Sequence, residues 1–328
     1  MSTAALLAAI DDKTTDEVLA RLASSLSVDD ACASPADAPM QPGDHDRVRN
    51  DTPLIRAARR GQASAVRVLL AAGAAVDRAI KGKTPLHIAA SWGHAEVVSL
   101  LLATGAAVDQ AAADNGWTPL LIAARQGHAE VASLLLAAGA AAHEAVGNGA
   151  TPLSVAIASG QLGCVRLLSS HGAPRKFTIH GTARTAEAYA TAQMQPAIAA
   201  WLASSRGWTA LHHLDTLTAG RARALLRGGA GPLVRRVADG PTPLDVARTP
   251  AHRDGEAAAL VRRAAEPWSP ATHALWPEAA RACAVTLARL GFQLSRQARF
   301  GNEGQGVMDC WRHGVMPAAL RRRSGGRV

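Results

Sequence analysis

The residues best suited to chemistry in this 328-residue sequence are its twelve histidines. His87 and His94 lie seven residues apart in TPLHIAASWGHAEVVSLL, and His212 and His213 are adjacent. Imidazoles can bind metals or act as general acids and bases. Neighbouring residues on a helix point in different directions, so His212 and His213 would make a poor chelate. What the histidines can do depends on the elements that position them.

The sequence around His87 recurs along the chain. Thr-Pro-Leu begins at Thr52, Thr84, Thr118 and Thr151, at intervals of 32, 34 and 33 residues. Threonine is a good N-cap and proline is tolerated in the first turn, so each copy predicts the start of a short helix. A glycine such as Gly93 ends that helix, and an aliphatic run then predicts a second helix buried against its neighbours.

These copies resemble the ankyrin-repeat family, whose unit of two helices and a β-turn finger repeats at about 33 residues. Thr84 to Ala89 carries the T-P-L-H-x-A motif in full. The resemblance implies that His87 hydrogen-bonds to Thr84 and to groups of the neighbouring repeat, and that His94 opens the second helix. The residues assigned to the structural repeat motif are Thr84, Pro85, His87, Gly93, His94, Thr118, Gly127 and His128.

The predicted fold class is an all-α ankyrin-repeat solenoid of helix–turn–helix units with β-turn fingers, plus a C-terminal helical module. Weaker copies begin at Thr185, Thr209 and Thr242, and PRKFTIHGTAR after Ala173 predicts a lengthened finger. The predicted parts are an N-terminal helical cap (1–26), a flexible insertion (27–50), four regular repeats (51–175), degenerate repeats (176–266), the C-terminal helical module (267–318) and an Arg-rich tail (319–328).

The C-terminal module departs from the repeat pattern. Pro277 predicts a helix start and Gly291 its end, and a second helix is expected from about Glu303 to Val315. One interpretation is a cap that seals the last repeat. The other is a docking box that presents a bound protein to a modifying enzyme such as a ubiquitin ligase, which would make the protein an adaptor.

The basic charge leaves two interpretations open. The formal net charge is +9, which could indicate nucleic-acid binding. Lysine occurs at only four positions, and the many arginines are scattered rather than gathered in one run. Compositional bias toward arginine, alanine and glycine explains this pattern without selection for binding, so nucleic acid is possible as a partner but not favoured.

The four cysteines lie far apart and form no C-x-x-C pair, which fits a reducing compartment. The N-terminal segment lacks the basic and apolar regions of a signal peptide, and no stretch reaches the roughly 18 apolar residues of a membrane span. The sequence therefore predicts a cytoplasmic or nuclear protein that does not associate with membranes.

Catalytic motifs are absent from the sequence. There is no phosphate-binding G-x-x-x-x-G-K-[ST] loop, no G-x-S-x-G and no H-E-x-x-H. Residues placed by repeat position lie about 10 Å apart in successive repeats, too far to gather around one metal. We therefore expect no enzyme activity, no cofactor, no metal site and no small-molecule substrate.

The positions that the repeat leaves free predict a protein-binding surface. In the ankyrin family, partners contact the fingers and the exposed face of the first helix. Tryptophan and arginine dominate interface energies, so this surface is expected to bind an unidentified protein through an acidic segment. The competing interpretation is that each tryptophan packs on an adjacent repeat. The predicted partner-binding residues are Arg59, Arg60, Lys81, Lys83, Ser91, Trp92, Trp117, Arg125 and Gln126.

Overall fold

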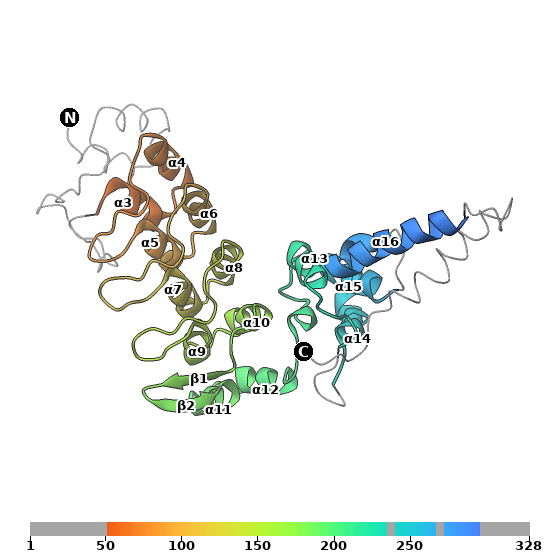
Figure 1. The fold of residues 1–328 in the computed structure, drawn as a ribbon. Coiled ribbons are helices and arrows are strands. Elements are labelled where there is room, and N and C mark those ends of the chain that lie inside the picture. The colour runs from red at the N-terminus through yellow and green to blue at the C-terminus, as the bar shows by residue number, and fades with distance from the viewer. Residues whose placement is uncertain (1–50, 235–239, 267–271, 296–328) are drawn as a thin grey trace, which may run out of the picture. The chain divides into compact units, whose positions relative to one another are not determined.

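The computed structural model describes residues 51–234, 240–266 and 272–295 (Figure 1). The chain divides into two compact units, with the boundary between Leu202 and Ala203. This boundary falls inside helix α12 (Pro196–Ser204), within the segment predicted as degenerate repeats. The predicted N-terminal cap (1–26), the insertion (27–50) and the Arg-rich tail (319–328) lie outside the described residues.

The four Thr-Pro-Leu copies form four helix pairs in unit 1. In each pair the threonine caps the first helix: Thr52 Oγ1, for example, accepts a hydrogen bond of 3.2 Å from the backbone N–H of Ile55. The pairs are α3 (Pro53–Arg60) with α4 (Ala63–Ala71), α5 (Pro85–Trp92) with α6 (Ala95–Ala103), α7 (Pro119–Gln126) with α8 (Ala129–Ala137), and α9 (Pro152–Ala158) with α10 (Leu162–Ser170).

The helix pairs stack in two rows, one of first helices and one of second helices (Figure 1). A continuous core runs between the rows. Alanine pairs such as Ala89 and Ala90 are fully buried because they let first helices approach closely, while leucines such as Leu101 and Leu135 fill the space between second helices. The prediction of an all-α solenoid of helix pairs is confirmed.

A longer finger follows the fourth pair. Strands β1 (Lys176–Ile179) and β2 (Thr182–Thr185) form an antiparallel hairpin in which Ile179 pairs with Thr182. The loop is His180 and Gly181, and both have positive φ, which matches the right-handed twist of the strands. This hairpin is the lengthened finger that the sequence predicts.

A fifth helix pair completes unit 1. It comprises α11 (Ala186–Ala192), capped by Thr185, and α12. The four regular pairs have Gly at the left-handed position between their helices, whereas this pair has Met194, with φ 56° and 87% of its surface exposed.

Unit 2 repeats the scheme in reduced form. Its elements are η1 (Ala210–His212), α13 (Ala219–Arg227), α14 (Pro243–Ala247), η2 (Pro250–His252), α15 (Glu256–Ala265), η3 (His273–Leu275) and α16 (Glu278–Ser295). Leu211, Leu226, Leu260 and Val261 are buried in its core. The short η1 replaces a full first helix, so the repeat that begins at Thr209 is degenerate.

Helix α16 corrects one expectation. It begins after Pro277 as predicted, but it continues through Gly291 to Ser295, so Gly291 does not end it. A single glycine lowers helix stability by only about 1 kcal/mol relative to alanine, so one glycine does not by itself end a helix. The second predicted helix, from Glu303 to Val315, lies outside the described residues. No helix in the described ranges is both long and apolar enough to cross a membrane.

Candidate protein-interaction site

Hydrogen bonds within and between repeats hold the histidines of the repeat motif. His87 is fully buried, and its Nδ1 lies 3.2 Å from the backbone nitrogen of Thr84 and 2.7 Å from Thr84 Oγ1. Its Nε2 lies 3.0 Å from the carbonyl oxygen of Trp117, in the next finger. Since Nδ1 accepts from the Thr84 N–H, Nε2 must carry the proton to donate to that carbonyl, and the ring is neutral. Burial lowers the pKa of His87, although the hydrogen bond to Trp117 opposes this shift.

The same arrangement recurs in unit 2. His212 Nδ1 accepts from the Thr209 N–H at 2.8 Å, and its Nε2 lies 2.9 Å from the carbonyl oxygen of Pro241. Pro241 precedes Thr242 as Trp117 precedes Thr118, so the bond again joins one repeat to the start of the next. Burial likewise lowers the pKa of His212.

His94 and His128 also join adjacent repeats. Each stands at the start of a second helix and contacts a carbonyl oxygen of the preceding repeat. His94 Nε2 lies 3.0 Å from the carbonyl oxygen of Arg59, and His128 Nε2 lies 3.2 Å from that of Ser91. The His128 ring also lies against Gly93, where an added Cβ would be 2.6 Å from Nδ1. These imidazoles hold the array together. Within the described ranges, no three His, Cys, Asp or Glu side chains are arranged to hold a metal.

The two candidate tryptophans have different surroundings. Trp92, at the end of α5, is 53% exposed. Trp117 is half-buried and packs against Leu121 of its own repeat and against Ala150 and Val155 of the next. The sequence left open whether each tryptophan packs on an adjacent repeat or is exposed for a partner. Trp117 packs on the adjacent repeat, and Trp92 is exposed on the surface.

Arg59, Lys83 and Arg125, three of the predicted cations, each lie next to a carboxylate or an aromatic ring. Arg59 donates from Nε and Nη2 to the carboxylate of Asp51 at 3.2 and 3.3 Å, in a pair whose side chains are 17% and 6% exposed. The guanidinium of Arg125 lies over Trp117, 5.4 Å from the ring centroid. Lys83 Nζ lies 3.7 Å from a carboxylate oxygen of Asp114, and both of those side chains are more than two-fifths exposed. Ser91 is half-buried, and Arg60 and Gln126 are exposed.

Lys81 stands at the tip of the finger between α4 and α5, which opens the second repeat and is called the second finger. Ile80 and Lys83 exchange two backbone hydrogen bonds of 3.0 Å across a two-residue loop, with φ of 49° at Lys81 and 77° at Gly82. This is the pattern of a tight hairpin turn, in which asparagine or glycine is usual at the first position. Among the described residues, the Lys81 ammonium makes no ion pair or hydrogen bond.

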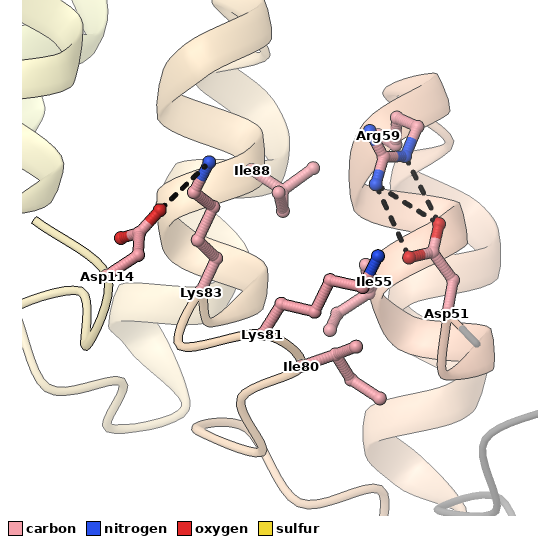
Figure 2. A pocket seen from close by; sticks show the side chains of 8 residues that line it. All are labelled: Asp51, Ile55, Arg59, Ile80, Lys81, Lys83, Ile88 and Asp114. Carbon is pink, nitrogen blue, oxygen red and sulfur yellow. Dashed lines mark hydrogen bonds and ion pairs between the residues drawn. The ribbon is translucent and has the colours of Figure 1, made fainter. Parts of the chain in front are cut away.

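A pocket of about 350 Å³ lies between this finger and the helices α3 and α5 (Figure 2). Its walls combine three cations, two carboxylates and three isoleucines. In Figure 2, the side chain of Lys81 extends over Ile55, with the Arg59–Asp51 pair on one side and the Lys83–Asp114 pair on the other. The lining residues are Asp51, Ile55, Arg59, Ile80, Lys81, Lys83, Ile88 and Asp114.

Sequence reasoning identified the pocket's cations but missed its carboxylates and isoleucines. Asp51 occupies the position before the threonine, where the next two copies have Lys83 and Trp117. When the copies are aligned by that position, the charge changes from negative at Asp51 to positive at Lys83. The sequence Ile80-Lys81-Gly82-Lys83 is also a recognisable hairpin signal. Nothing in the spacing shows that Asp51 and Arg59 neutralise each other.

The protein is a helical repeat protein, because its helix pairs stack on one another and carry projecting fingers. Hydrogen bonds from histidine side chains join adjacent repeats. The sequence matches the family model for ankyrin repeats (3 copies) over residues 6–112 and 104–179, more than half of the chain. The protein therefore belongs to the ankyrin-repeat family, whose members are typically non-enzymatic and whose repeats are general protein-interaction modules. A search of curated proteins found no match.

Proposed function

We propose that this protein is a non-enzymatic interaction scaffold that binds an acidic protein segment through the fingers and first helices of its first three repeats. The observation that carries the proposal is the exposure of Trp92 on α5, a helix whose Ile88 lines a pocket in which the Lys81 ammonium has no partner among the described residues. Tryptophan is among the residue types that contribute most to affinity where it lies at the centre of an interface. Trp92 and Ile88 lie four residues apart on α5, so they share one side of that helix.

Affinity capture from a cell extract tests the proposal, with the intact chain and two variants as baits. Trp92→Ala removes the exposed ring from the proposed surface. Met194→Gly is the matched control, because Met194 is an exposed large apolar side chain between α11 and α12, far along the sequence from the proposed surface. Circular dichroism should show equal helix content in all three proteins.

The expected result is a protein that the wild type and Met194→Gly recover and that Trp92→Ala recovers at least about fivefold less, because central aromatic residues contribute about 1–2 kcal/mol or more. The recovered protein should then bind the purified wild type directly with the same dependence on Trp92. Identical recoveries by all three baits would refute the role of this surface.

The two alternatives make separate predictions. An adaptor role depends on the module at 267–318, of which the structure describes only 272–295. It predicts that intact chains changed only in that module lose a second partner. Nucleic-acid binding predicts an affinity for a random oligonucleotide that falls steeply with salt. We expect neither to account for the dependence on Trp92.

A further inference from the structure

We propose that the pocket between the second finger and helices α3 and α5 is a carboxylate site. In it Lys81 pairs with one Asp or Glu side chain of the bound segment, while the isoleucines receive an aliphatic side chain next to it. This inference rests on the proposed function and adds the chemistry that the pocket selects.

The charges lining the pocket leave one cation unsatisfied. Asp51 holds Arg59 through two hydrogen bonds in a pair that is largely shielded from solvent, so Arg59 shapes the wall and its charge is matched. Lys83 and Asp114 form a long, exposed contact of the kind that contributes at most about 1 kcal/mol. Three cations face two carboxylates, and among the described residues Lys81 is the cation without a partner. A ligand carboxylate would balance the site.

The isoleucines of the pocket favour a ligand that has an aliphatic side chain next to its carboxylate. Ile55 and Ile88 are 1% and 9% exposed, and the side chain of Ile80 is half-buried on the finger. Together they supply the apolar part of the pocket around the Lys81 side chain (Figure 2). A pocket of about 350 Å³ is near the lower end of the usual range for ligand sites, which suits one or two side chains rather than a cofactor.

The finger holds Lys81 in place by a strained turn. The carbonyl of Gly82 accepts a hydrogen bond of 3.2 Å from the N–H of Ala113 in the next finger, and a Cβ at Gly82 would lie 2.7 Å from that nitrogen. Of the two loop residues, only residue 81 can therefore carry a side chain. A lysine with φ of 49° is unfavourable for the fold, and strained residues of this kind concentrate at binding sites.

The site continues toward Trp92. One helical turn, about 6 Å, separates Ile88 from Trp92 along α5. An extended peptide advances about 3.3 Å per residue, so a segment with its aliphatic side chain on Ile88 could place a side chain on Trp92 about two residues further on. Trp92 and Lys81 thus contribute to one surface in two ways that can be tested separately. Trp92→Ala tests recovery of the partner, and the Lys81 variants test the preference for a carboxylate.

The test uses the full-length chain and three fluorescein-labelled peptides that differ at one position: Gly-Ser-Leu-Glu-Leu-Ser-Gly and its Gln and Lys counterparts. Fluorescence anisotropy in about 50 mM salt keeps electrostatic screening weak. We expect the Glu peptide to bind about threefold to fivefold more tightly than the Gln peptide, and the Lys peptide to bind least.

Two substitutions assign the preference to Lys81. Lys81→Asn removes the charge but keeps a residue that favours the turn, and it should abolish the difference between the Glu and Gln peptides. Lys81→Glu should reverse the order, so that the Lys peptide binds best. Arg78→Asn is the control, because Arg78 is an exposed cation of the same finger that does not line the pocket, and it should preserve the Glu preference.

Equal affinities for the Glu and Gln peptides would overturn the inference, as would a Glu preference that survives in Lys81→Asn. Absence of binding by the wild type up to about 1 mM peptide, an affinity of about −4 kcal/mol, would overturn it too. None of these results would affect recovery of a partner that depends on Trp92, so failure of the carboxylate site and failure of the proposed function can be told apart.

Discussion

Arg125 lies over the indole ring of Trp117, with its guanidinium carbon 5.4 Å from the ring centroid. Arg59 and Asp51 occupy the same two positions of the first repeat and form an ion pair there. In the first and third repeats, therefore, the residue before the threonine contacts the residue two positions before the glycine. The contact is an ion pair in the first repeat and a cation–π interaction in the third. In the second repeat the equivalent residues are Lys83 and Ser91, and Lys83 instead contacts Asp114 of the next finger. Both pairs, Arg59–Asp51 and Lys83–Asp114, line the pocket that also contains Lys81.

Removal of the Asp51 carboxylate should destabilise unit 1. Asp51→Asn would remove the carboxylate charge that pairs with the half-buried Arg59 guanidinium, and we expect a loss of about 1–3 kcal/mol in the free energy of unfolding. The matched change Asp114→Asn breaks an exposed pair and should cost less than about 0.5 kcal/mol. Urea unfolding followed by circular dichroism measures both values. Equal losses in the two variants would contradict the assignment of the Asp51–Arg59 pair as the stronger one.

Gly93→Ala should destabilise the array more than Gly105→Ala. Both glycines have positive φ, of 76° and 92°, so alanine is strained at either position by about 1–2 kcal/mol. An added Cβ at Gly105 meets nothing within 4 Å, whereas at Gly93 it would lie 2.6 Å from His128 Nδ1. We expect an extra loss of about 1–2 kcal/mol at Gly93. If His128→Ala did not reduce this difference in a double-mutant cycle, the contact would not be its cause.

Met194→Gly should stabilise the fifth helix pair. Met194 has φ 56° and is 87% exposed, so its side chain loses little contact on removal while the backbone strain is relieved. The net gain should be about 0.5–1 kcal/mol after the entropy of glycine is counted. Ala192→Gly, in the last turn of α11, introduces the same residue at a helical position and should instead destabilise by up to about 1 kcal/mol. Thermal unfolding of both variants checks the opposite signs.

Stability should fall as the pH drops below about 6.5. Burial lowers the pKa values of His87 and His212 in the folded state, so below about 6.5 the unfolded chain binds protons that the folded chain does not. Above that pH both imidazoles are neutral in either state and contribute no slope. We expect the midpoint of thermal unfolding to fall by at least about 2–4 °C between pH 7.5 and 5.5.

His87→Ser should reduce this pH dependence. Ser154 occupies the equivalent position in the fourth repeat, where its Oγ accepts a hydrogen bond of 2.9 Å from the N–H of Thr151, so serine can keep the local cap. His143→Ser removes an exposed imidazole from a finger and is the control. A slope that flattens equally in both variants would show that His87 is not the group responsible.

The helix pairs and their register follow from local sequence alone. Thr-Pro fixes where each first helix begins, and glycine fixes where the four regular pairs turn, because capping and left-handed backbone are properties of a few adjacent residues. The recurrence of His87, His94 and His128 in register predicted their structural role for the same reason. Gly291 shows the limit of such local signals, since α16 runs through it.

The spacing of the repeats brought Arg59, Lys83 and Arg125 to one predicted surface, but only the tertiary structure decided which of their charges are matched. Ion pairs and ring contacts depend on side-chain atoms a few ångströms apart that belong to different helices and fingers, and a linear pattern does not encode those distances. The same holds for the tryptophans: Trp117 packs on the next repeat because Ala150 and Val155 face it, and Trp92 remains exposed. Local sequence therefore determined the helix pairs, whereas packing between repeats decided that Trp92 stays exposed and that the Lys81 ammonium has no partner among the described residues.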